Sequence, residues 1–250
     1  LVSLTIPAAF AAARRAFAAE QAAIGVAALV AAMPGFAMAA ARVSNDGLSA
    51  LVFALLLLVV LELGERPDRK RALLAGTLLG LGLVTKAYFL TALPAMALLS
   101  LWWIWRNRTQ FGRAFSNVVL VFGAAGAISA WWYLRNYLQT GSWSGLQQVA
   151  GRDGLSLGEL IPRIPGVDWG RFFDTAFFTH VWSGNWSFLQ LRGWMYQVFA
   201  VVALLAAAGL LLRLWRDRPA RMPVLTCLSL YTFFWLGLCY HELTFSTLGV

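Results

Sequence analysis

A few polar and charged residues stand out in a chain that is otherwise almost continuously apolar. The stretch 41–50, ARVSNDGLSA, places Arg42, Asn45 and Asp46 between two segments that are each long enough to cross a bilayer. Lys86 lies in LGLVTKAYFL with no other charged residue within a dozen positions. Charged groups near the membrane interior are costly and usually mark a pathway, a water-filled cavity or a binding site. These residues are therefore candidates for a functional site.

Two further polar groups are candidates, and a purely structural role is open for each of them. Arg135 and Asn136 lie in WWYLRNYLQTG, and His241 lies in LCYHE.

A structural role is also open for the candidates named first. Ser-Asn-Asp-Gly is a sequence typical of turns, and any of its three polar residues can cap a helix that begins near Leu48. Lys86 can extend to the lipid headgroups. Arg135 can equally anchor the chain among aromatic rings at the membrane interface, and His241 can simply end a span.

Other classes of site are poorly supported by the sequence. The glycines of LLGLGLV lie within an apolar segment and lack the lysine pattern of a P-loop. Only two histidines occur, His180 and His241, so a zinc site of standard spacing is unsupported. No nucleophile elbow occurs.

The composition indicates an integral membrane protein. The chain is 60% hydrophobic and 12% charged, its mean hydropathy is +0.69, and soluble domains carry about 25% charged residues. The net charge of +9 and the twelve tryptophans fit short basic loops and interfacial indole rings, so nucleic acid is not an expected partner. Cys227 and Cys239 lie about 18 Å apart on one helix, too far for a disulfide.

The candidate residues are expected on an all-α, polytopic transmembrane helix bundle. The segment 72–105 would form a helix of about 51 Å, which exceeds a hydrocarbon core of about 30 Å, so it must form two helices that turn near Lys86. With this division, the fragment is expected to cross the membrane about seven times. The apolar segments that predict these helices are 22–41, 47–64, 72–105, 114–134, 195–212 and 222–240.

The basic residues predict which ends of the helices are cytoplasmic. Thirteen of the 20 lysines and arginines fall in clusters at 14–15, 65–71, 106–113 and 213–221, which places those loops in the cytoplasm. Asp46, Lys86, Arg135 and His241 then share the outer face, which in a bacterial inner membrane is the periplasmic one.

The domain organisation is expected to be one truncated transmembrane domain over 1–250, with residues 135–193 as an extracytoplasmic loop. Ser156 and Glu159 have capping-box spacing, and Asp168 can cap another short helix. Both helices are expected to lie on the membrane surface because aromatic rings accompany their charges. The chain begins at Leu1 after no initiator methionine, so we expect an internal fragment of a longer protein.

Four stretches in this order resemble the C-type polytopic glycosyltransferases, in particular the protein O-mannosyltransferase and aminoarabinose transferase group and related bacterial predicted membrane proteins. MPGFAMAAARVSNDGLSALVFALLLL resembles two spans joined by an outer loop that carries an Asp, and LLAGTLLGLGLVTKAYFLTALPAMAL resembles the family's GLxxLTK span pair. WWYLRNYLQTGSWSG resembles the segment that opens a long outer loop, and FFTHVWSGNWSFLQLRGWMYQVF the stretch that closes it.

The resemblance implies that a sugar is transferred, with inversion, from a polyprenyl-phosphate carrier to a glycan, lipid or protein acceptor. A carboxylate acts as the base, while cations or a divalent metal stabilise the phosphate leaving group. By family position, Asp46 matches the second acidic residue of the site, and the principal catalytic Asp is expected before Leu1. Lys86 matches a lysine that contacts the lipid phosphate, and Arg135 is a second phosphate contact. The weaker substrate-binding candidates are Arg42, Asn45, Asn136 and His241.

Two other functions remain open at this point. A transporter or flippase of lipid-linked glycans would use the same cations to bind a phosphate in transit, and a noncatalytic membrane protein could keep the same fold. A transporter more often shows polar groups at mid-span, helices broken by Gly or Pro, or an internal repeat. The charges of this chain stay at one face, which favours surface chemistry.

Overall fold

The computed structural model describes residues 2–17, 19–42, 44–141, 143, 157–181, 191–216 and 221–245, and within them it is all-helical. Two compact units form. Unit 1 comprises Leu1–Leu51 and Asp168–Leu225, and unit 2 comprises Val52–Val167 and Thr226–Val250. Helix α4 (Asn45–Glu65) begins in unit 1 and continues into unit 2.

Unit 1 is built on a closely packed helix pair, α1 (Thr5–Phe17) and α2 (Glu20–Ala32). Ala8, Ala12 and Ala16 are buried at four-residue spacing on α1, so one face of small side chains lets the two backbones approach. The unit also holds α3 (Pro34–Ala41), α9 (Trp169–Val181) and α10 (Gly193–Arg216).

An arginine of α10 donates a hydrogen bond to a backbone carbonyl at the C-terminus of α1. Arg213 Nη2 donates a hydrogen bond of 2.7 Å to the carbonyl of Phe17, and its guanidinium lies 5.2 Å from the centre of the Phe17 ring. The last carbonyls of a helix have no partner within the helix, so this contact both caps α1 and fixes α10 against it.

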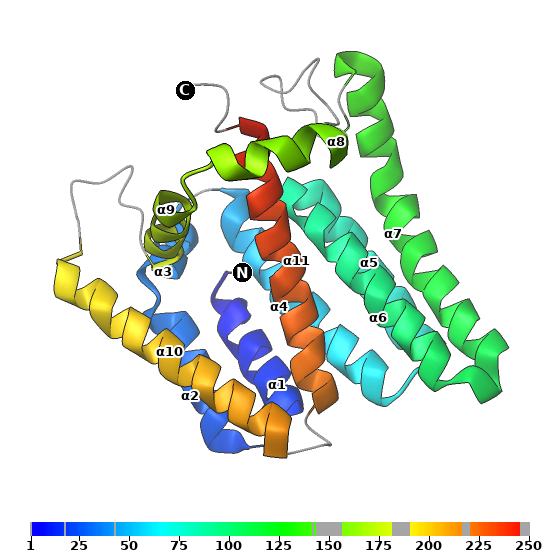
Figure 1. Cartoon of the computed structure of the whole chain (residues 1–250). Helices are drawn as coiled ribbons and strands as arrows, with labels where there is room; N and C mark the ends of the chain where they lie inside the picture. The colour runs from blue at the N-terminus through cyan, green and yellow to red at the C-terminus, as the bar shows by residue number, and fades with distance from the viewer. Residues whose placement is uncertain are drawn as a thin grey trace. The chain divides into compact units, whose positions relative to one another are not determined.

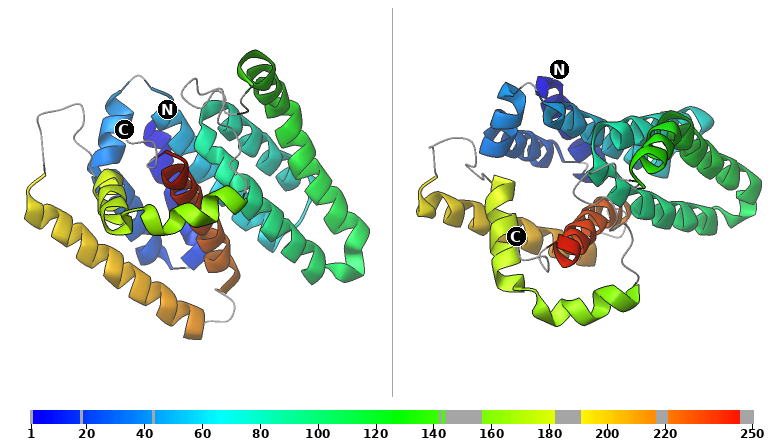
Figure 2. Two further views of the ribbon diagram at one scale, coloured as in Figure 1. Left: turned by 45° about the horizontal axis from the view of Figure 1, so that its top comes forward. Right: turned by 90° about the horizontal axis from the view of Figure 1, so that it is seen from above.

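Unit 2 is organised around two parallel helices, α5 (Arg69–Thr85) and α7 (Phe111–Thr140), which lie side by side (Figures 1 and 2). A Cβ atom at Gly76 would overlap the carbonyl oxygen of Val121, and one at Gly80 would lie 2.9 Å from the carbonyl oxygen of Ala125. Only glycine therefore permits this spacing, as in membrane helix pairs with glycines four residues apart.

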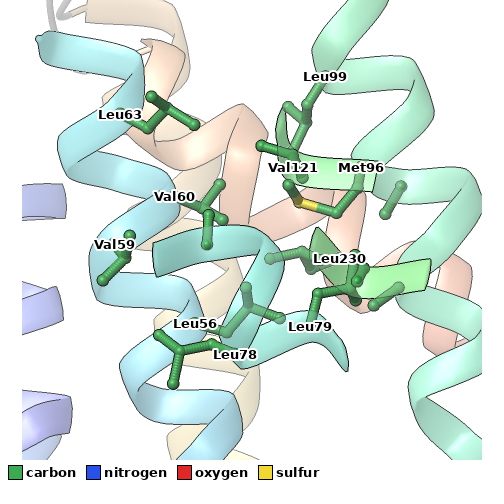
Figure 3. Close-up of a cluster of buried hydrophobic side chains, with 14 of the residues drawn as sticks. Leu56, Val59, Val60, Leu63, Leu78, Leu79, Met96, Leu99, Val121 and Leu230 are labelled. Carbon is green, nitrogen blue, oxygen red and sulfur yellow. The ribbon is translucent and has the colours of Figure 1, made fainter. Parts of the chain in front are cut away.

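Helices α4, α6 (Ala92–Arg106) and α11 (Arg221–Phe245) close an apolar core around this pair. Unit 2 also holds the short α8 (Leu157–Leu160) with its following 3-10 turn (Ile161–Gly166). In Figure 3, Leu56, Leu79, Met96, Val121 and Leu230 come together from five helices, and each is at most 3% exposed.

The predicted division of 72–105 is confirmed, since α5 ends at Thr85 and a 3-10 turn (Ala87–Thr91) leads into α6. The capping role of Asp168 is also confirmed, because its Oδ1 accepts the backbone N–H of Arg171 at 3.0 Å in the first turn of α9. Ser156 lies outside the described residues. The position of α8 and α9 on a membrane surface stays a prediction.

The number of candidate spans is lower than the seven predicted. Among the described residues, five helices are long and apolar enough to cross a membrane, or six if α2 and α3 form one bent span. The axis bends by 60° between them, where Pro34 begins α3. Proline cannot donate the backbone hydrogen bond that would continue α2. The count is also lower because α5 is not among the candidate spans: its 17 residues fall just short of the usual length of a membrane-spanning helix.

Candidate functional site

The turn after α5 holds Lys86 by a set of backbone and ring contacts. Lys86 caps the C-terminus of α5: its N–H donates to the carbonyl of Gly82 at 2.9 Å, and its own carbonyl accepts from the N–H of Phe89 at 3.1 Å. The Phe89 ring is 1% exposed and occupies the space that a side chain at Gly82 would need. It also meets the Phe53 ring of α4 edge-on at 6.0 Å between centroids. The backbone of Lys86 is thus held by its neighbours, and the residue is half-buried.

A tyrosine of α7 joins this turn to the helix that carries Arg135. Tyr133 Oη donates a hydrogen bond of 2.8 Å to the carbonyl of Leu83 in the last turn of α5. Arg135 is two residues further along, exposed, with its guanidinium 5.9 Å from the Trp132 ring centroid. Asn136 is 9% exposed. Because α5 and α7 run parallel, Lys86 and Arg135 belong to the same end of unit 2.

His241 belongs to this end of unit 2 as well. On α11, Phe234 meets the Tyr88 ring at 6.1 Å, and a side chain at Gly237 would overlap Thr91. His241 follows Gly237 by four residues and so lies one turn further on the same helix face. Helix α11 continues to Phe245, so His241 lies in its final turns and is not the residue that ends the helix.

An apolar pocket of about 330 Å³ lies in unit 2 and is lined by residues of α5, α6, α7 and the turn between α5 and α6. Leu83 and Leu90, which flank Lys86 in the chain, both line it, and so does Tyr133. Its size lies within the range of ordinary ligand pockets. The complete lining, called here the apolar pocket, is Leu83, Leu90, Leu93, Phe122, Ala125, Gly126, Ser129, Tyr133 and Trp143.

The remaining predicted site residues, Arg42, Asn45 and Asp46, lie in unit 1 around the start of α4. Ser44 is the residue that caps this helix: its Oγ accepts the N–H of Asp46 at 3.3 Å and donates to Asp46 Oδ2 at 3.1 Å. The helix begins at Asn45, three residues before the predicted start near Leu48. Asp46 also suits this place structurally, because a carboxylate in the first turn interacts favourably with the helix dipole.

In unit 2, the site candidates offer the cations of Lys86 and Arg135 and the amide of Asn136, and the same unit contains the apolar pocket. Among the described residues, no three His, Cys, Asp or Glu side chains gather in a group able to hold a metal ion. Lys86 and Arg135 are suited to bind a phosphate group, and the pocket is suited to an apolar chain.

A family model for dolichyl-phosphate-mannose-protein mannosyltransferases matches residues 1–144, more than half of the chain. The chain belongs to this mannosyltransferase family. Membership implies a membrane glycosyltransferase that uses a sugar carried on a polyprenyl phosphate. No curated protein and no solved structure matches the chain.

The mannosyltransferase match covers α1 to α7 and therefore most of the predicted site. Asp46, Lys86 and Arg135 lie within it, whereas His241 lies outside it. Tyr133 and the leucines of the apolar pocket are not apparent as functional candidates from the sequence. Tyr133 lies in the WWYLRN motif, but nothing in the sequence indicates that its hydroxyl reaches Leu83. The stretch 182–190, which is the middle part of the fourth family-like motif (177–199), lies outside the described residues.

Proposed function

We propose that this protein transfers a sugar from a polyprenyl-phosphate carrier to an acceptor on the outer, periplasmic face of a bacterial inner membrane, with inversion. The observation that carries the proposal is that Leu83 and Leu90, on either side of the turn that carries Lys86, both line the apolar pocket. A ligand with a long apolar chain and a phosphate head matches this pairing of a cation with an apolar pocket. Family membership supplies the chemical class of that ligand.

The proposed reaction is a single displacement at the anomeric carbon of the sugar. The acceptor oxygen bonds to this carbon from the side opposite the phosphate, the bond from the carbon to the phosphate oxygen breaks, and polyprenyl phosphate leaves. A carboxylate takes the proton of the acceptor hydroxyl. We assign Asp46 to the site as its second acidic residue, which orients the substrates, and we do not assign the base to it.

The cations act on the leaving group. Negative charge grows on the phosphate as its bond to the sugar breaks, and fixed cations that stabilise this charge lower the barrier. We assign this role to Lys86 and, as a second contact, to Arg135. Arg42, Asn45, Asn136 and His241 are proposed as further polar contacts to the substrates.

The test uses the full-length protein in proteoliposomes with polyprenyl-phosphate mannose as the probe donor. Lys86→Ala is expected to lower sugar transfer about 10²-fold, the usual cost of losing one group that stabilises transition-state charge. Lys70→Ala is the matched control and should keep full activity, because Lys70 belongs to the first turn of α5, at the opposite end. Full activity of Lys86→Ala would remove Lys86 from the site.

A second pair of variants tests the carboxylate. Asp46→Asn should reduce sugar transfer strongly with little change in donor binding. Asp174→Asn, at an exposed position on α9, should leave sugar transfer unchanged. Movement of the intact probe donor between leaflets without any sugar transfer would instead support a flippase.

A further inference from the structure

A second pocket lies in unit 2 at the ends of α6 and α7 that are far from Lys86. It is lined by the side chains of Asn107, Gln110, Arg113 and Asn117 together with Trp103 and Pro67. Its inner volume is about 30 Å³, which holds about two water-sized groups, and its mouth reaches the surface at the exposed Gln110 and Arg113. Arg135 is about 27 Å further along α7 than Asn117 by the helix rise. This amide pocket is therefore separate from the candidate active site.

Asn117 gives the amide pocket the character of a binding site. Its side chain is 5% exposed, and neither Oδ1 nor Nδ2 has a hydrogen-bond partner in the part of the chain that the structure describes. A buried amide without partners is unfavourable. A ligand in the amide pocket would supply the partners that the fold does not.

The surroundings of the amide pocket carry positive charge. Arg113 lines it, and Arg106 and Arg108 belong to the same connection between α6 and α7. The carboxylates of Glu62 and Asp68, which adjoin the lining residues Leu63 and Pro67 in the sequence, already bind Arg71.

Indole rings accompany these cations. Arg106 lies 5.1 Å from the Trp102 ring centroid, and Trp105 is exposed. Tryptophan and arginine side chains together are typical of the level of the lipid headgroups.

We propose that the amide pocket binds a phosphate group. The Arg113 guanidinium and the Asn117 Nδ2 donate to phosphate oxygens, and the Asn117 Oδ1 accepts from a hydroxyl of the ligand. The phosphate comes either from the headgroup of an anionic phospholipid or from free phosphate in solution. The inference goes beyond the proposed sugar transfer and does not depend on it.

Binding is measured on the purified full-length protein as the shift in unfolding temperature on titration with phosphatidylglycerol or, separately, with inorganic phosphate. The pocket variants are Arg113→Gln and Asn117→Leu, and the control is Arg108→Gln, a neighbouring arginine that does not line the amide pocket. Each pocket variant should raise the apparent Kd about tenfold, the effect of one hydrogen bond to a charged group. The control should bind as the parent protein does.

The stability of Asn117→Leu without ligand separates binding from folding. This variant should unfold at the same or a higher temperature than the parent, because it removes an unpaired buried amide. Binding of phosphatidylglycerol alone identifies a lipid headgroup, and equal binding of inorganic phosphate identifies the free ion. Absence of binding to both, equal loss in Arg108→Gln, or unchanged binding in Asn117→Leu would overturn the proposal.

Discussion

The position of Lys86 depends on residues that carry no charge. Gly82 leaves the space that the Phe89 ring fills, and Tyr133 binds the carbonyl of Leu83. Each contact fixes the turn on one side of Lys86, so the ammonium group is attached to a backbone that has little freedom. In the proposed phosphate site, a cation carried on such a rigid turn would stabilise developing charge with little reorganisation of the backbone.

Loss of the Tyr133 hydroxyl should therefore loosen this turn. Tyr133→Phe keeps the ring and leaves the Leu83 carbonyl without this donor, so the free energy of unfolding should fall by about 1 kcal/mol. Tyr137→Phe is the control, since Tyr137 lies one turn further along α7 and is 45% exposed. Thermal unfolding in detergent measures both, and equal stability of the two variants would show that the Tyr133 contact contributes nothing.

A second residue-scale prediction concerns the connection between α4 and α5. The backbone N–H of Arg71 donates to Asp68, and this bond, together with the Arg71 guanidinium, holds the pKa of Asp68 below its ordinary value despite partial desolvation. A carboxylate whose pKa is lower in the folded state stabilises that state above the unfolded pKa of about 3.9. The stabilisation is lost as the pH falls through the lower, folded pKa.

Asp68→Asn should consequently unfold at a lower temperature than the parent at pH 7. The difference should shrink as the pH is lowered below about 4, where Asp68 of the parent also becomes neutral. Unfolding temperatures of both proteins between pH 3 and pH 7 measure this, with Asp174→Asn as the control. A difference that is independent of pH would contradict the assigned cause.

At the scale of elements, the approach of α5 to α7 determines how Lys86 and Arg135 are brought to one end of unit 2. Gly76→Ala would push a Cβ into the Val121 backbone and should cost about 1–3 kcal/mol of unfolding free energy. Gly123→Ala makes the same change on α7, where nothing lies within 4 Å of the added atom. It should be neutral or stabilising, because alanine favours a helix. Unfolding of the two variants is compared directly, and similar losses would rule out close packing as the reason for Gly76.

Much of this arrangement could be predicted from length, charge and capping chemistry. The turn at Lys86 followed from a segment too long for one span, and the start of α9 from Asp168. The C-terminal end of α7 differs from the expectation, since polar residues from Arg135 onward indicate an exit from the helix, whereas α7 continues to Thr140. It ends there because Gly141 takes a positive φ of 70°, which glycine adopts readily.

The features that the sequence does not predict depend on contacts between segments that are distant in the chain. The Tyr133 bond to Leu83 and the burial of the Asn117 amide without a partner among the described residues arise from the packing of α5, α6 and α7, which no local pattern specifies. The bend at Pro34 was accessible from sequence, because proline interrupts helices, but the unbroken apolar run indicated one span.

At the scale of the whole molecule, lipid must cover the large apolar surfaces. Helix α10 has no buried residue, and its Leu204, Leu205 and Leu211 side chains are each at least 66% exposed. In unit 2, the basic clusters at 66–71 and 106–113 lie at the ends of α5, α6 and α7 opposite to Lys86 and Arg135. The excess of basic residues on cytoplasmic loops is the reason for proposing an outward-facing site.

Single cysteines at the two ends of α7 test this orientation. Helix α7 has 30 residues and so extends about 45 Å, which exceeds the hydrocarbon core. In a full-length protein whose native cysteines are replaced by serine, Thr140→Cys should react with a membrane-impermeant maleimide in intact spheroplasts. Arg108→Cys should react only after the membrane is permeabilised, and the cysteine-free parent should not react at all. The reverse pattern would place Lys86 and Arg135 in the cytoplasm and would end the case for sugar transfer on the outer face.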